Sequence, residues 1–259
     1  MDLGIKGKKA LVCASSKGLG FGCAESLADA GVNLVLNARS EHQLELTADY
    51  IQKNYGVEVQ AVAADITSEE GRVRVIEAVG APDILVTNAG GPPPGRWQDW
   101  DRDDFIRALD ANMLTPIALM KALIPSMIVK RWGRVVNITS ASVKAPILTL
   151  GLSNSSRSGL TGYVAGTSRQ VARFGVTINN LLPGAHETDR IATLVSSMSQ
   201  DRGISEGEIR AEMQASIPVG RYGTPQEFGA ACAFLCSLHA GFIVGQNILL
   251  DGGGVNATF

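Results

Sequence analysis

Short apolar runs alternate with longer segments of helical pattern along most of the chain. Each run is rich in β-branched residues and apolar at consecutive positions, which is typical of strands that are buried on both faces. The runs span residues 10–14, 33–37, 57–63, 84–87, 134–138, 177–182 and 247–250. Because helical segments separate the runs, they fit βαβ units, whose strands pair in parallel. The pattern predicts an α/β fold, a doubly wound parallel sheet of about seven strands with helices on both faces.

The chain shows no internal division. Its 259 residues are 45% apolar, which suffices for one large buried core, and no linker or shift of composition interrupts them. We therefore expect a single domain over residues 1–259. Residues 185–217 are polar, prone to helix and distant from any predicted strand. Since ligands bind at the carboxyl edge of such sheets, we interpret this segment as a lid over the substrate.

Charge and composition narrow the range of partners. The net charge is -2, and lysine and arginine are scattered, so neither nucleic acid nor an anionic membrane surface is an expected partner. The first residues lack the layout of a secretory signal, and the most apolar stretch, 117–129, is interrupted by Lys121 and Pro125. A cytoplasmic protein is expected. The four cysteines have neither disulfide nor metal-ligand spacing, so no metal site is predicted.

A glycine-rich turn directly follows the first predicted strand and leads into a helix. It consists of Ser15, Ser16, Lys17, Gly18, Leu19 and Gly20. Glycines permit a tight turn and a close approach of the backbone to a pyrophosphate, while the free N–H groups of the helix N-terminus attract the anion. Such a turn can also serve chain reversal alone, but its position after the first strand favours a nucleotide site. Ala14 stands where a first glycine is usual, so a slightly different turn is expected.

Three further features at the ends of later strands agree with a nucleotide site. Asp65 ends the third strand, where a carboxylate can accept a hydrogen bond from an adenine amino group. The other two are the stretch Asn88, Ala89, Gly90 after the fourth strand and Pro183, Gly184 and Thr188 after the sixth. Because the carboxyl ends of parallel strands meet at one edge of a sheet, these features together predict a dinucleotide site.

With these features, and with the segments GRYGTPQEF and DGGG near its end, the chain resembles the short-chain dehydrogenase/reductase family over nearly all of its length. The resemblance implies a Rossmann-like fold, a nicotinamide dinucleotide cofactor and a small-molecule carbonyl or alcohol substrate. It also implies that the Asn-Ala-Gly stretch supports the central strand and lines the adenosine site. The residues after Pro-Gly are expected to touch the nicotinamide amide. A homotetramer is expected, with paired helices at 113–131 and 153–173.

The end of the second strand indicates which cofactor binds. NAD-binding relatives usually carry an acidic residue there, which accepts from both ribose hydroxyls, but here the stretch is Asn37, Ala38, Arg39, Ser40. No carboxylate repels a phosphate at this place, and Lys17 and Arg39 can converge on the adenosine 2'-phosphate. Each charge-assisted contact contributes about 1.5–3 kcal/mol. NADP(H) is therefore predicted, the alternative being that both side chains are solvated surface cations.

The catalytic positions depart from the family pattern. Carbonyl reduction needs a donor that protonates the developing alkoxide and a positive charge that makes this donor more acidic. In the family, a serine orients the carbonyl, an asparagine holds a water, and the tyrosine and lysine of a YxxxK motif supply donor and charge. The resemblance places Ser140 and Asn112 in the first two roles. Ser153 and Arg157 occupy the positions of the tyrosine and the lysine, so the site is atypical.

This substitution affects turnover more than binding. An aliphatic hydroxyl is far less acidic than a phenol, so Ser153 is a poor proton donor, and losing a positioned general acid typically lowers the rate by about 10² to 10⁴. Arg157 keeps the positive charge and can hold ribose hydroxyls, but it cannot pass a proton along. Lys144 and His186 are alternative donors, although a solvated loop lysine and a structural histidine are the ordinary interpretations. Tyr163 lies about 15 Å from Ser153 along the same helix and is expected in the core.

Three functions remain open. The favoured one is an NADP(H)-dependent oxidoreductase that reduces a ketone or ketoacyl substrate through a non-standard site, similar to the β-ketoacyl carrier-protein reductases of the family. The second is a catalytically impaired NADP(H)-binding protein with a sensing or partner role. The third is an enzyme that uses the fold for elimination or isomerisation without net redox. The loop GGPPPGRWQDW at 90–100 and the lid suggest a shaped pocket, which favours the reductase.

Overall fold

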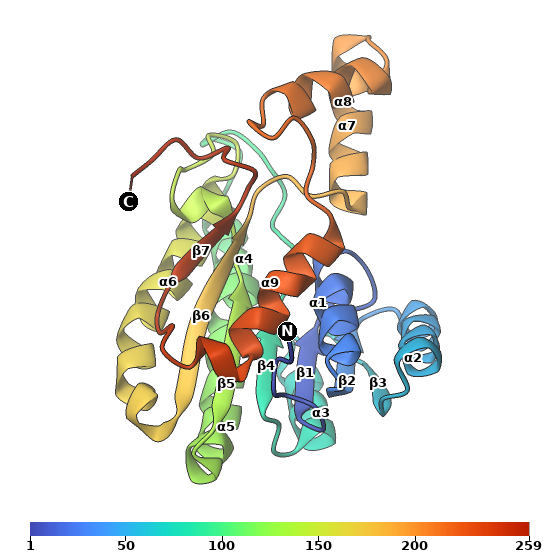
Figure 1. Cartoon of the computed structure of the whole chain (residues 1–259). Coiled ribbons are helices and arrows are strands. Elements are labelled where there is room, and N and C mark those ends of the chain that lie inside the picture. Colours follow the sequence, from blue (N-terminus) through green and yellow to red (C-terminus); the bar gives the residue numbers. More distant parts are fainter. Residues whose placement is uncertain (259) are drawn as a thin grey trace.

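Within residues 1–258, which the computed structural model describes, seven strands form one parallel sheet in the order β3-β2-β1-β4-β5-β6-β7 (Figure 1). The strands are β1 Lys9–Cys13, β2 Asn33–Ala38, β3 Val59–Ala63, β4 Ile84–Thr87, β5 Gly133–Ile138, β6 Val176–Pro183 and β7 Asn247–Leu250. The predicted α/β fold, a single Rossmann-like domain with a doubly wound sheet, is confirmed. The strand order reverses between β1 and β4, in the middle of the sheet.

Helices cover both faces of this sheet. One face carries α1 (Gly18–Asp29), α2 (Glu41–Tyr55) and α9 (Pro225–Cys236), and the other carries α3 (Glu69–Val79), α5 (Thr115–Lys130) and α6 (Gly151–Val171). Shorter elements are α4 (Arg102–Leu109), the π turn η1 (Asp110–Leu114) and the 3-10 turns η2 (Ala141–Val143), η3 (Ala172–Phe174) and η4 (Leu238–Ala240). Successive strand residues point to opposite faces, as Leu11 and Val12 do, so each face has its own apolar cluster.

Helix α5 continues from α4 and the π turn as one helical run, Arg102–Lys130. By length and composition, it is the one run within residues 1–258 that is long and apolar enough to cross a membrane. Its apolar side packs on the sheet, where Leu119, Met120 and Leu123 are almost fully buried. A helix in the core of a sheet protein passes the same test of length and composition.

Glycines hold α1 against α9. A Cβ atom built on Gly22 would lie 2.1 Å from the carbonyl oxygen of Pro225, and one on Gly229 would lie 2.0 Å from the carbonyl oxygen of Gly22. Only glycine permits so close an approach. The four cysteines are free and buried, and Cys23 and Cys232 belong to the apolar cluster on this face. The contact fixes the position of α1, whose N-terminus lies at the carboxyl edge of the sheet.

A chain of side-chain hydrogen bonds crosses four strands of the sheet. The Thr87 hydroxyl donates to Asn137 Oδ1 at 2.7 Å, and Asn137 Nδ2 donates to Asn180 Oδ1 at 3.1 Å. Asn180 Nδ2 donates in turn to Asn247 Oδ1 at 2.7 Å. Because each of these polar groups finds a partner on the next strand, the chain satisfies them and keeps β4, β5, β6 and β7 in register.

Residues 185–217 leave the sheet and form a helical hairpin above its carboxyl edge (Figure 1). The hairpin consists of α7 (Asp189–Arg202) and α8 (Glu206–Ala215). Backbone bonds tie its base to the fold. The N–H of Glu187 donates to the carbonyl of Gly223 at 2.8 Å, and the N–H of Gly223 donates to the carbonyl of Ala185 at 3.0 Å.

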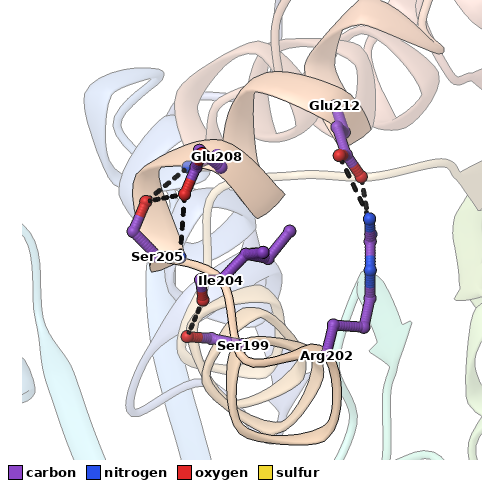
Figure 2. Close-up of polar contacts among 6 residues, drawn as sticks. All are labelled: Ser199, Arg202, Ile204, Ser205, Glu208 and Glu212. Carbon is purple, nitrogen blue, oxygen red and sulfur yellow. Dashed lines mark hydrogen bonds and ion pairs between the residues drawn. The ribbon is translucent and has the colours of Figure 1, made fainter.

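Side chains stabilise the turn between the two helices of the hairpin (Figure 2). Ser205 caps α8, and Ser205 and Glu208 exchange hydrogen bonds between side chain and backbone in a capping box. Arg202, at the end of α7, donates to both carboxylate oxygens of Glu212 in α8, at 2.6 and 3.1 Å. The hairpin is therefore a unit with its own internal contacts.

Candidate active site

A cavity of about 730 Å³ lies at the carboxyl edge of the sheet, beside the place where the strand order reverses. Open parallel sheets bind ligands at such a place. Residues that follow β1, β2, β3 and β4 line the cavity, together with residues of α4 and the π turn. Of the residues predicted to bind the cofactor, the lining includes Ser16, Lys17, Arg39, Asp65, Ala89 and Gly90.

The glycine-rich turn has the backbone that a phosphate site needs. A Cβ atom on Gly20 would lie 2.2 Å from the carbonyl oxygen of Ala14, so only glycine fits there. Helix α1 begins at Gly18 without a side-chain cap, which leaves its first N–H groups available to an anion. Ala14 has a φ of 47°, in the left-handed region that glycine favours, at a cost of about 1–2 kcal/mol. This conformation ends β1 at Cys13, one residue before the predicted end.

Three of the predicted cofactor residues do not line the cavity but stabilise the backbone that forms its wall. Ser15 is fully buried, and both its N–H and its hydroxyl donate to the carbonyl of Asn37. Leu19 packs against the apolar cluster beneath α1. Asn88 Nδ2 donates to the carbonyl of Ala14 at 3.4 Å, which joins the ends of β1 and β4. These residues shape the cavity through its backbone.

The segment after β6 reaches across to the glycine-rich turn. Pro183 ends β6, and a Cβ atom on Gly184 would lie 2.7 Å from the Cα of Asp251, so the backbone is packed tightly beside the end of β7. Thr188 directly precedes α7, and its methyl group would lie 3.5 Å from a Cβ atom on Gly18. The start of the hairpin therefore lies beside the start of α1.

Charged groups surround the mouth of the cavity. Lys17 forms an ion pair with Asp189 at 2.5 Å, with 68% and 73% of the two side chains exposed. Arg39 lines the same cavity and takes part in none of the ion pairs found within residues 1–258. The N–H and hydroxyl of Thr67 both donate to Asp65, and these bonds, with a smaller contribution from Arg39, lower the pKa of the Asp65 carboxyl. Arg39 is thus the cation that remains available to a phosphate.

Ser153 and Arg157 lie one turn apart on α6 and are hydrogen-bonded to each other. Arg157 Nε donates to Ser153 Oγ at 3.2 Å, and Arg157 Nη1 donates to the carbonyl of Ile138, at the end of β5, at 2.9 Å. Both side chains are buried, with Ser153 3% and Arg157 6% exposed. Because the guanidinium donates to it, the Ser153 hydroxyl keeps its own proton for another acceptor.

Ser140 and Asn112 come from two different turns that contact α6, η2 and η1. Ser140 Oγ accepts from the N–H of Ser142 at 3.1 Å, so the Ser140 proton is also available. Asn112 is buried in the π turn. Its Nδ2 donates to the carbonyl of Ala108 at 3.3 Å, while its Oδ1 has no partner within residues 1–258. A buried amide oxygen of this kind is a place for an ordered water.

A second guanidinium belongs to the site, and the sequence did not predict it. Arg190, in the first turn of α7, lies so close to the backbone of Gly91 that a Cβ atom there would be 2.0 Å from Arg190 Nη1. The pKa of Arg157 is lowered to about 10, chiefly by burial and in addition by the charge of Arg190. The one signal in the sequence was the position of Arg190, two residues after Thr188.

The other candidate proton donors have different surroundings. His186 is buried, contacts the carbonyl of Gly184 through Nδ1 at 3.3 Å and stacks edge-on against Phe228. Burial lowers the pKa of His186, which favours the neutral ring. Lys144 is half-buried and directly follows η2, while Tyr163 packs against the apolar cluster on the α6 face. Among residues 1–258, no group of three or more His, Cys, Asp or Glu could hold a metal ion.

Comparisons with known proteins identify the family. Residues 13–254 match the family model described as enoyl-(acyl carrier protein) reductase. The chain belongs to the short-chain dehydrogenase/reductase family. The 3-oxoacyl-[acyl-carrier-protein] reductase FabG of Vibrio cholerae is 31% identical over 257 residues, which cover 97% of this chain and 98% of the relative.

Solved structures of this short-chain dehydrogenase/reductase type superpose on nearly the whole chain. L-sorbose reductase from Gluconobacter frateurii, complexed with NADPH and L-sorbose, has a TM-score of 0.95 at 27% identity, covering 99% of this chain and 100% of that one. YwfH, an NADPH-dependent reductase involved in bacilysin biosynthesis, has a TM-score of 0.91 at 26% identity, covering 97% and 100%. The predicted oxidoreductase is confirmed, and the NADPH of these neighbours agrees with the predicted NADP(H) cofactor.

Proposed function

We propose that this short-chain dehydrogenase/reductase reduces a ketone or ketoacyl substrate with NADPH, through a non-standard site in which a serine and an arginine replace a phenol and an amine. The hydrogen bond from Arg157 Nε to Ser153 Oγ is the observation that carries the proposal. It joins a buried cation to a hydroxyl that still has a proton to donate. A developing alkoxide needs these two groups.

The cavity fits the adenosine end of NADP(H). The uncapped N-terminus of α1 is suited to the pyrophosphate, because Gly18 and Gly20 let the backbone approach it. Arg39, with Lys17, would hold the 2'-phosphate, and Asp65 would accept from the adenine amino group. The bound cofactor supplies the hydride. By the family resemblance, the residues around Thr188 would contact the nicotinamide amide.

Residues of the chain then bind and protonate the carbonyl oxygen of the substrate. Ser140 and Ser153 donate to it, and Ser153 passes its proton as negative charge develops. Arg157 remains charged at neutral pH, since its pKa of about 10 is well above 7, and it stabilises the negative charge electrostatically. Asn112 would hold a water through Oδ1. Because a guanidinium does not relay protons, solvent rather than Arg157 reprotonates Ser153.

Two further parts of the proposal concern the outer elements. The hairpin at 185–217 is proposed to be a substrate lid, since its first turn brings Asp189 and Arg190 to the cavity. The enzyme is proposed to be a cytoplasmic homotetramer. Exposed glycines along α6 and an apolar groove along α5 leave room for the paired helices that the family resemblance implies.

A second candidate is a catalytically impaired NADP(H)-binding protein with a sensing or partner role. The contrast between the nucleotide site and the proposed catalytic site favours it. The nucleotide site keeps the glycines that its backbone requires, whereas Tyr163, the tyrosine nearest in sequence to Ser153 on α6, packs against the apolar cluster on the α6 face. Such a protein would bind NADPH without turning it over.

Single-turnover mixing of the protein and NADPH with ketones, diketones, sugars and ketoacyl thioesters separates the two functions. NADPH oxidation by any compound supports the reductase, and binding without oxidation supports the second candidate. In the latter case, Ser153→Tyr combined with Arg157→Lys should introduce activity. If Lys144→Ala or His186→Ala abolished an activity that Ser153→Ala left intact, the proton donor would be that residue and not Ser153.

A further inference from the structure

Arg157, in the proposed catalytic site, and Arg190, in the first turn of α7, have no carboxylate partner within residues 1–258. Arg157 is 6% exposed, and its hydrogen bonds go to two neutral groups, the Ser153 hydroxyl and the Ile138 carbonyl. None of the ion pairs found within residues 1–258 includes Arg157 or Arg190. Buried charges are normally paired. Arg157 is therefore a buried positive charge that an anionic ligand would balance, while the Arg190 side chain is exposed and free to reach such a ligand.

Arg190 brings the second charge from the hairpin. It lies against the backbone of Gly91, and its charge acts on Arg157 closely enough to contribute to the lowered pKa of that residue. Another arginine of the same helix is engaged elsewhere, because Arg202 donates to both oxygens of Glu212 (Figure 2). Within residues 1–258, no acidic partner holds Arg190 in this way, so its guanidinium is available to a ligand.

We propose that the substrate carries a carboxylate and that Arg190 and Arg157 bind it, while Ser153 and Ser140 hold the ketone. This inference rests on the proposed reductase function. A planar carboxylate accepts two parallel bonds from a guanidinium, which makes arginine well suited to recognise it. Because Ser153 and Arg157 are in hydrogen-bond contact, the ketone and the carboxylate must be close together in the substrate. A 2-oxo or 3-oxo acid meets this condition.

The phosphates of the cofactor are the competing anions. They have a different place in the site, because the uncapped N-terminus of α1 and Arg39 lie where β1 and β2 end. Arg157 is bound to the end of β5, on the other side of β4. Arg157 thus lies nearer to the catalytic hydroxyls than to the ends of β1 and β2. Arg190 lies against Gly91, which lines the nucleotide cavity, so the NADP⁺ affinity of an Arg190→Met variant distinguishes a role toward the cofactor from one toward the substrate.

The test compares acids with their neutral esters on protein loaded with NADP⁺, so that no hydride is transferred. Titration calorimetry would measure the Kd of 2-oxobutanoate and 3-oxobutanoate and of the methyl ester of each. We expect at least one acid to bind ten times more tightly than its ester. Arg190→Met should remove most of this preference. Arg74→Met, at an exposed arginine of α3 outside the ion pairs of residues 1–258, should leave it unchanged.

Each outcome is decisive for one of the two proposals. Equal affinity for acid and ester in both pairs would overturn the carboxylate inference. So would an Arg190→Met variant that lost NADP⁺ affinity but kept the acid preference, since Arg190 would then serve the cofactor. Acid-selective binding without any oxidation of NADPH would support the carboxylate site and remove the reductase. Reduction of the esters as fast as the acids would support the reductase and remove the carboxylate site.

Discussion

The nucleotide site and the proposed catalytic site follow the family pattern to different degrees. At the nucleotide site, the positive φ of Gly18 favours glycine and the crowding of Gly20 against the Ala14 carbonyl requires it. At the proposed catalytic site, our assignment puts Ser153 and Arg157 in place of both groups that the family uses to move a proton. Cofactor binding depends on shape and charge, whereas proton donation depends on the acidity of one group. On the proposed assignment, the two requirements change separately on one fold.

The largest expected effect comes from breaking the shape of the nucleotide end. In Gly20→Ala, the new Cβ atom would overlap the carbonyl of Ala14, so the turn must open. We expect NADPH affinity to fall more than tenfold and the free energy of unfolding to fall by about 3 kcal/mol. Fluorescence titration and urea denaturation measure the two effects.

Gly207→Ala is the matched control for Gly20→Ala. Gly207 lies in α8, and a Cβ atom there would meet only the Ser205 hydroxyl, at 3.9 Å. A stability gain of about 0.5–1 kcal/mol is expected, since alanine suits a helix better than glycine. If Gly20→Ala bound NADPH as the unchanged protein does, the nucleotide end would not depend on backbone shape as argued.

The next largest effect concerns the positive charge of Arg39 at the nucleotide site. Arg39→Ala should weaken NADPH binding by roughly 10- to 100-fold, because a charge-assisted bond to the 2'-phosphate contributes about 1.5–3 kcal/mol. Binding of NADH, which lacks that phosphate, should not change. Arg74→Ala serves as the control. An equal loss of NADH affinity would mean that Arg39 stabilises the turn after β2 and does not bind the 2'-phosphate.

The smallest effect concerns the ion pair across the cavity mouth. Asp189→Asn should release Lys17 and raise NADPH affinity about two- to fivefold at low salt, since exposed ion pairs contribute at most about 1 kcal/mol. The gain should disappear in high salt. Glu212→Gln breaks another ion pair of the hairpin and should leave NADPH affinity unchanged. A lower NADPH affinity in Asp189→Asn would show that the Lys17–Asp189 pair stabilises the NADPH-bound protein.

The fold was predictable because buried parallel strands are apolar on both faces, a pattern that a short stretch of sequence is enough to show. The placement of Ser153 and Arg157 one turn apart on a single helix was predictable from their spacing, while their catalytic roles stay a prediction. Arg190 and the Lys17–Asp189 pair were not predictable, because they join segments far apart in the sequence whose approach depends on where the hairpin lies. The π turn around Asn112 was missed as well, since its residues have no distinctive propensity.

The backbone bonds between residues 185–187 and Gly223 fix the base of the hairpin to the rest of the fold. Beyond this base, Asp189 and Arg190 are adjacent in the first turn of α7. Asp189 pairs with Lys17 of the glycine-rich turn, and Arg190 lies against Gly91, so a single helical turn contacts the segments that follow β1 and β4. A phosphate that drew Lys17 away from Asp189 would therefore remove one of the contacts that join this turn to the nucleotide cavity.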